Sequence, residues 1–133
     1  MELKERRILL IEDNPIDATF IRKILRKYNI NKNFIIASNG SETFGILERL
    51  AKKNQLPDLI LLDLNLPDIS GIDLLTGIKA DSRFGKIPVA IFTGSNVDDD
   101  IQKSYDLGAI TYLVKPVSSQ ALKMALENIF STC

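Results

Sequence analysis

The stretch that decides the fold is Pro57-Asp58-Leu59-Ile60-Leu61-Leu62-Asp63-Leu64-Asn65-Leu66-Pro67. Its centre, Leu59 to Leu62, is an unbroken aliphatic run, so both faces of this segment need burial. A short run of this kind, bounded by prolines, is typical of a central strand in a parallel sheet. The run ends on Asp63. Because ligands of open parallel sheets bind at the carboxyl ends of the strands, we expect Asp63 to lie at the functional edge.

Four more apolar segments predict four more strands, at residues 7–11, 34–37, 87–92 and 109–114. Segments of helical periodicity alternate with them, at about residues 15–28, 44–51, 72–79, 98–107 and 122–130. This βα alternation predicts an α/β fold, a doubly wound five-stranded parallel sheet with helices on both faces. No linker or second domain is visible, so we expect residues 1–133 to form a single domain.

Two of the predicted helices have distinctive ends and faces. The helix at about 15–28 begins with Asn14 as cap before Pro15, and its apolar residues at helical spacing are Ile16, Phe20, Ile24, Leu25 and Tyr28. The helix at 98–107 has only a thin apolar stripe, so we expect it to be the least firmly held of the five. Three consecutive aspartates in its first turn suit the helix dipole.

Composition excludes several classes of function. Lys+Arg and Asp+Glu both number 17, which leaves no basic excess for nucleic acid or an anionic membrane surface. No apolar run is long enough to span a bilayer, and the charged amino terminus lacks the apolar core of a signal peptide. The one cysteine, Cys133, is last in the chain, so it is expected to be inert, and the chain is expected to be cytoplasmic. The chain has no histidine, which removes the commonest catalytic base and metal ligand.

Polar residues stand at the carboxyl ends of four predicted strands: Glu12 and Asp13, Asp63, Thr93, and Lys115. Carboxylates gathered at one edge repel each other unless a cation lies among them, and oxygen ligands alone favour Mg²⁺ over zinc. An ionised Asp63 can attack a phosphoryl group and carry it as an acyl phosphate. A lysine ammonium and a hydroxyl, here Lys115 and Thr93, are groups that neutralise transferring phosphoryl oxygens.

These residues, together with Gly71, Gly94 and Pro116, resemble the receiver domain of two-component response regulators, and the stand-alone members are similar in length. The resemblance extends from about Arg6 to Phe130. It implies a flavodoxin-like fold with strand order 2-1-3-4-5. It also implies a phosphorylation-dependent signalling switch that is not an enzyme in its own right, since it catalyses only its own phosphorylation and slow dephosphorylation.

By this resemblance Asp63 is the phosphoacceptor, charged by a histidine kinase or a phosphotransfer protein. Asp13, Asp63 and the backbone carbonyl of Asn65 match the Mg²⁺ ligands, and Glu12 acts through water. Lys115 matches the lysine that pairs with the phosphoryl group. The peptide bond between Lys115 and Pro116 is expected to be cis. The family often has two aspartates where this chain has Glu12-Asp13, and a glutamate at the first position is a common variant.

The resemblance also implies a switch pair, Thr93 and Tyr112, and a downstream protein partner that the sequence does not name. The usual partner and homodimer face is the fourth helix, fifth strand and fifth helix, around Tyr105, Tyr112 and Val117. The basic first helix is implied to help dock the kinase side. No output domain follows Phe130, so output is expected to be by binding, without nucleic-acid or membrane contact.

Three other functions share features with this sequence. A phosphatase of the haloacid dehalogenase type also uses a strand-end aspartate, but it needs a second aspartate where this chain has Asn65. A nucleotide or flavin module needs a Gly-rich turn after the first strand, and here that turn reads Glu12-Asp13-Asn14-Pro15. A pseudo-receiver that docks partners without phosphorylation stays open as the alternative. Tyr112 is also open between a mobile switch and an aromatic side chain that only packs.

Overall fold

The computed structural model describes residues 2–131, and the inert role predicted for Cys133 lies outside the described residues. Five strands and five helices alternate after a short 3-10 helix, η1 (Leu3–Glu5). In chain order they are β1 (Arg7–Ile11), α1 (Pro15–Lys27), β2 (Asn33–Ala37), α2 (Gly40–Lys52), β3 (Leu59–Leu62), α3 (Gly71–Ala80), β4 (Val89–Thr93), α4 (Asp98–Asp106), β5 (Thr111–Val114) and α5 (Ser119–Ser131).

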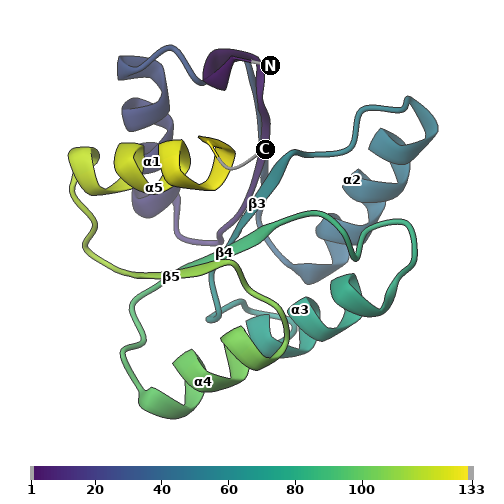
Figure 1. Cartoon of the computed structure of the whole chain (residues 1–133). Helices are drawn as coiled ribbons and strands as arrows, with labels where there is room; N and C mark the ends of the chain where they lie inside the picture. The colour runs from purple at the N-terminus through teal and green to yellow at the C-terminus, as the bar shows by residue number, and fades with distance from the viewer. Residues whose placement is uncertain (1, 132–133) are drawn as a thin grey trace.

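The five strands form one parallel sheet in the order β2-β1-β3-β4-β5, which confirms the predicted flavodoxin-like topology (Figure 1). β3, the strand that decides the fold, pairs with β1 on one side and β4 on the other. All four of its residues are buried, as its unbroken aliphatic run requires. A central strand of this kind has helices over both faces, so neither set of alternate side chains reaches water.

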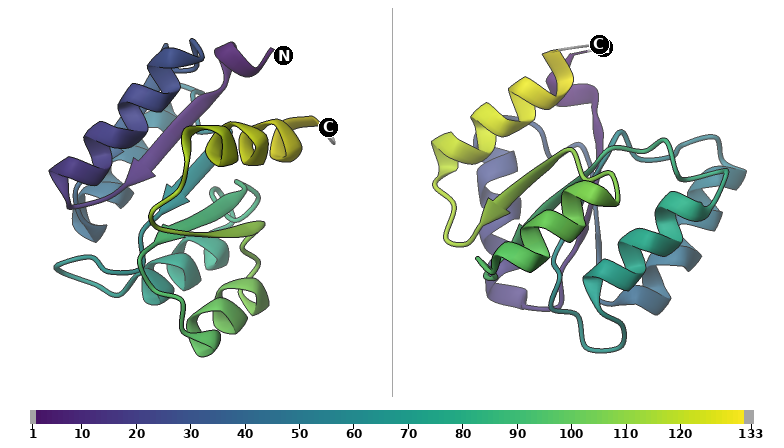
Figure 2. Two further views of the ribbon diagram at one scale, coloured as in Figure 1. Left: turned by 90° about the vertical axis from the view of Figure 1, so that its left-hand side faces the viewer. Right: turned by 60° about the horizontal axis from the view of Figure 1, so that its bottom comes forward.

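Alternate residues along each strand enter two separate cores. In β1, Ile8 and Leu10 pack with α1 and α5, whereas Leu9 and Ile11 pack with α2 and α3. Figure 2 shows these two groups of helices on opposite sides of the sheet. Each fully buried Leu or Ile side chain contributes roughly 1.5–3 kcal/mol, so the two cores together supply most of the stability.

Two predicted strand starts are wrong by two residues. The expected strand at 87–92 begins instead at Val89, because the Ile87 amide closes a turn by donating to the Phe84 carbonyl at 3.0 Å. The expected strand at 109–114 begins at Thr111, because the Ala109 amide donates to the Ser104 carbonyl at 2.9 Å. In both cases the amide is bound by the segment that precedes the strand, and the regular strand begins two residues later.

The buried face of α1 differs from the predicted one. Ile24 and Leu25 are buried as expected, but Ile16 is 77% exposed and Phe20 is 41% exposed. Ala18 and Ile21 complete the buried face instead. The small Ala18 lets the first turns of the helix lie close to the sheet, and the larger apolar side chains point to solvent. The predicted Asn14 cap is confirmed, since its side chain accepts from the amides of residues 16 and 17.

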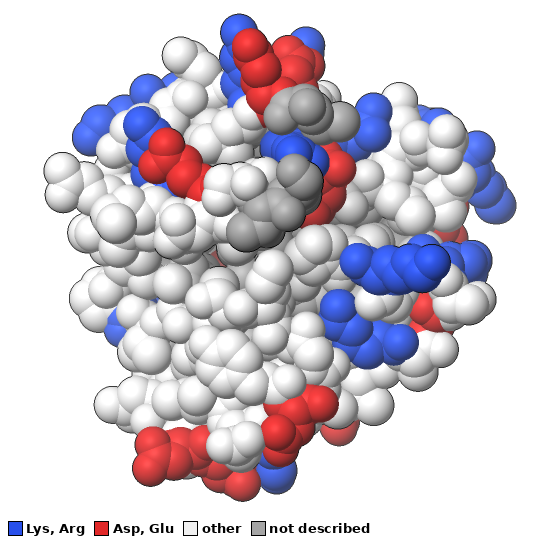
Figure 3. Space-filling view, in the orientation of Figure 1, with Lys and Arg blue, Asp and Glu red and all other residues white. Residues whose placement is uncertain are grey.

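α4 is the most weakly buried of the four helices α1 to α4 over the described residues, in agreement with its thin apolar stripe. Its one buried residue is the polar Ser104, whereas α1, α2 and α3 each bury at least four residues. Acidic side chains gather over this helix, which carries Asp98, Asp99 and Asp100 in its first turn (Figure 3). Gly108, with a φ of 99°, ends the segment. Among residues 2–131, no helix has the length and apolar character that crossing a membrane requires.

Candidate functional site

The ends of four strands are brought side by side by the last hydrogen bonds of the sheet. The Asp63 amide donates to the Ile11 carbonyl at 3.0 Å, just beyond the paired part of β1 and β3. The Lys115 amide donates to the Thr93 carbonyl at 2.7 Å, which does the same for β4 and β5. Because the strands are parallel, the polar residue after each strand lies at the same edge.

The Lys115 ammonium is the centre of the cluster at this edge. Nζ donates to Glu12 Oε1, to Asp17 Oδ2 at 2.8 Å and to Asp63 Oδ2 at 3.0 Å. The lysine side chain is only 16% exposed, and those of Glu12 and Asp63 are almost fully buried. The structure therefore brings together Glu12, Asp63 and Lys115, which are far apart in the sequence.

The loop after Asp63 is held tightly against this edge. Asp63 Oδ1 accepts from the Asn65 amide at 3.1 Å, while Oδ2 accepts from Lys115. The Gly71 amide donates to the Leu64 carbonyl at 2.9 Å. A Cβ atom at Gly71 would lie 2.4 Å from Leu64 Cα and 2.7 Å from the Asp63 carbonyl oxygen. Only glycine allows α3 to start so close to the loop that carries Asp63 and Asn65.

Burial and hydrogen bonding shift the pKa values of Glu12, Asp63 and Lys115 in different directions. Burial raises the pKa of Glu12 to about 7, and its hydrogen bond with Asp63 adds to the effect. Burial also acts to raise the pKa of Asp63, but hydrogen bonds with Glu12 and the Asn65 amide outweigh it, so this pKa is lowered. Burial acts to lower the pKa of Lys115, but its carboxylate partners outweigh burial and raise it. Asp63 is therefore ionised and Lys115 charged at neutral pH.

Three carboxylates at this edge can converge on one metal ion. Ligand oxygens of Glu12, Asp13 and Asp63 all lie within 4.8 Å of one another. Asp13 is exposed, and a hollow beside it is lined by Asn65 and the following loop. The donors on these side chains are all oxygen, which suits Mg²⁺ or Mn²⁺ better than a softer metal. The residues present therefore fit the divalent ion predicted from the sequence.

The remaining predicted site residues lie next to this cluster. Thr93 is fully buried. Its hydroxyl makes no hydrogen bond of normal geometry among the described residues, but it lies near enough to Asp63 to help lower the pKa of that carboxyl. A Cβ atom at Gly94 would meet no atom within 4 Å, so the space beside Thr93 is open. The partly buried Tyr112 donates its hydroxyl to the Ser95 carbonyl at 2.9 Å, which ties the ring to the loop after β4. The Lys115-Pro116 bond is cis, as expected.

Two acidic residues at this edge were missed by sequence reasoning. Asp17, in the first turn of α1, pairs with Lys115. Asp68 accepts from the Gly40 amide at 2.9 Å and from the amide and hydroxyl of Ser41, and so joins the loop after β3 to the start of α2. The spacing of Asp17 from Asp13, one helical turn, is a local signal that could have drawn attention to it. Asp68 offers no such signal, because its partners are 27 and 28 residues away.

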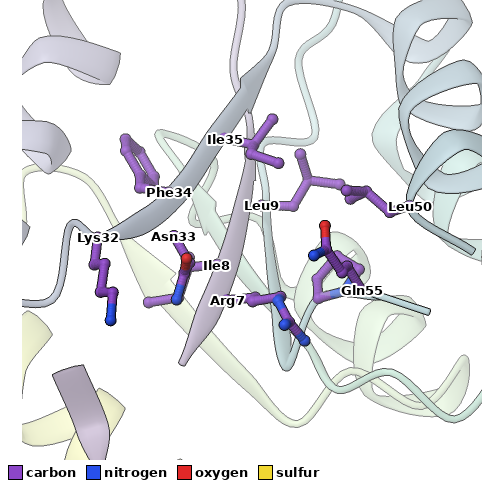
Figure 4. A pocket seen from close by; sticks show the side chains of 10 residues that line it. Arg7, Ile8, Leu9, Lys32, Asn33, Phe34, Ile35, Leu50 and Gln55 are labelled. Carbon is purple, nitrogen blue, oxygen red and sulfur yellow. The ribbon is translucent and has the colours of Figure 1, made fainter. Parts of the chain in front are cut away.

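A separate hollow lies at the opposite edge of the sheet (Figure 4). Its lining includes Arg7 and Asn33, the first residues of β1 and β2, whereas the acidic cluster follows the last residues of the strands. No Asp or Glu is among the described residues that line it. It therefore lacks the carboxylates that a hard metal ion or a covalent phosphoacceptor needs.

Comparison with known proteins agrees with this geometry. The family model of the response regulator receiver domain matches residues 8–127. The response regulator Rcp1 of Synechocystis is 33% identical over 126 residues, which cover 93% of this chain and 86% of that protein. The crystal structure of the Mn²⁺-bound form of Rcp1 has a TM-score of 0.78 at 34% identity, and covers 95% of this chain and 92% of its own.

A second solved structure is that of the phosphorylated cyanobacterial phytochrome response regulator RcpA. It has a TM-score of 0.82 at 33% identity, and covers 96% of both chains. The matched region includes β1 from Ile8 on, all of β2 to β5, and the residues that follow the strands at the acidic edge. The chain therefore belongs to the response regulator receiver domain family.

Proposed function

We propose that this protein is a signalling switch in which Asp63 accepts a phosphoryl group from a histidine kinase or a phosphotransfer protein. The modified chain then changes its affinity for a downstream partner. The observation that carries this proposal is the 3.0 Å contact between Lys115 Nζ and Asp63 Oδ2, beside the carboxylates of Glu12 and Asp13. A nucleophile, a cation and a set of metal ligands meet at one point, as phosphoryl transfer requires.

Asp63 supplies the nucleophile. Its lowered pKa keeps the carboxylate ionised at neutral pH. One carboxylate oxygen forms a bond to phosphorus while the bond from phosphorus to the donor nitrogen breaks, and the imidazole of the donor histidine leaves with that electron pair. Asp13, Asp63 and the backbone carbonyl of Asn65 would hold Mg²⁺, with Glu12 acting through water. The ion supplies positive charge that offsets the charge on the phosphoryl oxygens.

Lys115 and Thr93 would bind the oxygens of the transferred group. The ammonium already lies against the oxygen of Asp63, so it needs little movement to reach a phosphoryl oxygen. The buried Thr93 hydroxyl lacks a partner among residues 2–131, and a phosphoryl oxygen would provide an acceptor. A movement of Thr93 would displace Ser95, which lies two residues further along the chain. The Ser95 carbonyl accepts a hydrogen bond from the Tyr112 hydroxyl. Through these contacts, phosphorylation would shift the populations of two conformations of β5 and α4.

Two exposed apolar surfaces suit the partners of such a switch. Ile16 and Phe20, beside the site on α1, line a shallow hollow together with Lys23, and we assign the phosphate donor to this surface. Tyr105 and Val114 are exposed on α4 and β5, the face that we assign to the downstream partner or to a second copy of the chain. We further propose that the chain acts in the cytoplasm as one receiver domain.

Incubation with acetyl phosphate and Mg²⁺ tests the proposal. The intact mass of the wild type is expected to increase by one phosphoryl group, and Asp63→Asn is expected to abolish the increase. Glu48→Gln, which removes a carboxylate from the exposed surface of α2, is the control and should be modified like the wild type. If the wild type gains no mass, the phosphoacceptor role is wrong, and a docking module that works without phosphorylation becomes the better description.

A further inference from the structure

In the resting protein the Lys115 ammonium has no free N–H. An ammonium has three donors, and all three are taken by the carboxylates of Glu12, Asp17 and Asp63. Two of these acceptors follow strand ends and belong to the acidic edge itself. The third, Asp17, comes from the second helical position after Pro15 and approaches the ammonium from the side of α1.

We propose that Asp17 is a positioning residue that holds Lys115 in a resting ion pair and competes with the phosphoryl group for it. The inference deepens the proposed function and depends on it. In the resting protein the third N–H points to Asp17. When Asp63 carries a phosphoryl group, the ammonium shifts from the Asp63 oxygen toward the new oxygens, and the contact with Asp17 holds it back. The strength of the ion pair thus sets how readily the site accepts its ligand.

Asp17 competes for the ammonium and is not needed to support it, because two other carboxylates already hold Lys115. Glu12 and Asp63 are buried acceptors that keep Lys115 at the strand ends without help from Asp17. The Asp17 side chain is 33% exposed, so it can turn toward water when the ammonium leaves. Removing the Asp17 charge leaves the lysine less neutralised, so more of its positive charge is available to an anion. The backbone amide of Asp17 is bound by the Asn14 cap, so a change of side chain leaves the helix start intact.

Binding of beryllofluoride, a phosphoryl mimic, in excess Mg²⁺ measures this competition by calorimetry. Asp17→Asn is expected to tighten binding roughly five-fold, since a partly exposed ion pair that opposes movement of the lysine is replaced by a weaker neutral contact. Asp17→Glu restores the charge and should bind within about two-fold of the wild type. Glu48→Gln removes a distant carboxylate and should change nothing. Tighter binding is a readout that damage to the structure would not produce.

The same substitution in a Lys115→Met background shows whether Asp17 acts through the lysine. There Asp17→Asn is expected to change the affinity by less than about two-fold, because the ion pair no longer exists. Unchanged or weaker binding by the single variant would overturn the inference, as would a full five-fold gain that persists without Lys115. Binding by the wild type but not by Asp63→Asn would uphold the phosphoacceptor role in either case. No binding by the wild type would end both proposals.

Discussion

Substitution of Gly71 by alanine should destabilise the protein through a backbone clash. The added Cβ would lie 2.4 Å from Leu64 Cα and 2.7 Å from the Asp63 carbonyl oxygen, and no side chain can rotate to relieve either contact. Overpacking of this kind costs about 1–3 kcal/mol, and two backbone contacts put the cost at the upper end. Alanine recovers about 0.5–1 kcal/mol by restricting the unfolded chain. The net expectation is a loss of about 2 kcal/mol in the free energy of unfolding.

Gly45→Ala is the matched control within the same protein. Gly45 is exposed in the middle of α2, and a Cβ atom there meets nothing within 4 Å. This variant should gain about 0.5–1 kcal/mol, because only the chain entropy and helix propensity change. Urea denaturation monitored by circular dichroism measures the free energy of unfolding of both variants. The urea midpoint of Gly71→Ala should fall by about 1 M relative to the wild type.

The two variants must move in opposite directions. If Gly71→Ala is as stable as Gly45→Ala, the close approach of α3 to the loop after Asp63 is not a constraint, and the account of that glycine is wrong. A displaced loop also moves the carbonyl oxygen of Asp63 itself. We therefore expect Gly71→Ala to be phosphorylated more slowly by acetyl phosphate even at temperatures where it is fully folded.

Two further predictions concern groups at the same edge. Thr93→Val removes a buried hydroxyl that has no hydrogen-bond partner among the described residues. It should therefore raise the free energy of unfolding by about 1–2 kcal/mol and weaken the binding of beryllofluoride. A loss of stability would mean that the hydroxyl is hydrogen-bonded in the resting protein. The pKa of Asp68 is lowered by the Gly40 and Ser41 amides. Its stabilisation is therefore fully present above a pH of about 4 and disappears as the pH falls through the folded-state pKa. Asp68→Asn should be less stable than the wild type at pH 7, and the gap between their urea midpoints should narrow at pH 3; a gap that stays constant would show that the charge of Asp68 is not what joins its loop to α2.

Much of the site could be predicted because each strand ends on its functional residue. The aliphatic runs before Asp13, Asp63 and Lys115 identify buried parallel strands, and parallel strands bring their carboxyl ends to one edge. The convergence of these side chains follows from this local pattern, whereas the order of the strands was implied only by the resemblance to receiver domains. The starts of β4 and β5 were predicted less well, because a turn and a helix end compete for the same amides.

The contacts of Asp17 and Asp68 could not be predicted in the same way. Each is an ordinary acid in a turn or a helix start, and its partner lies far along the chain. The exposure of Ile16 and Phe20 could not be predicted either, because their helical spacing is equally compatible with a position facing the core. Which face of α1 is buried depends on how the helix axis lies across the sheet.

The sequence alone thus determined the layered fold and the acidic edge, because alternation and burial along a strand are local properties. Tertiary structure decided which acids pair with the Lys115 ammonium and which apolar side chains of α1 stay in solvent. Those outcomes depend on distances between elements, and such distances are set only when both cores pack at once.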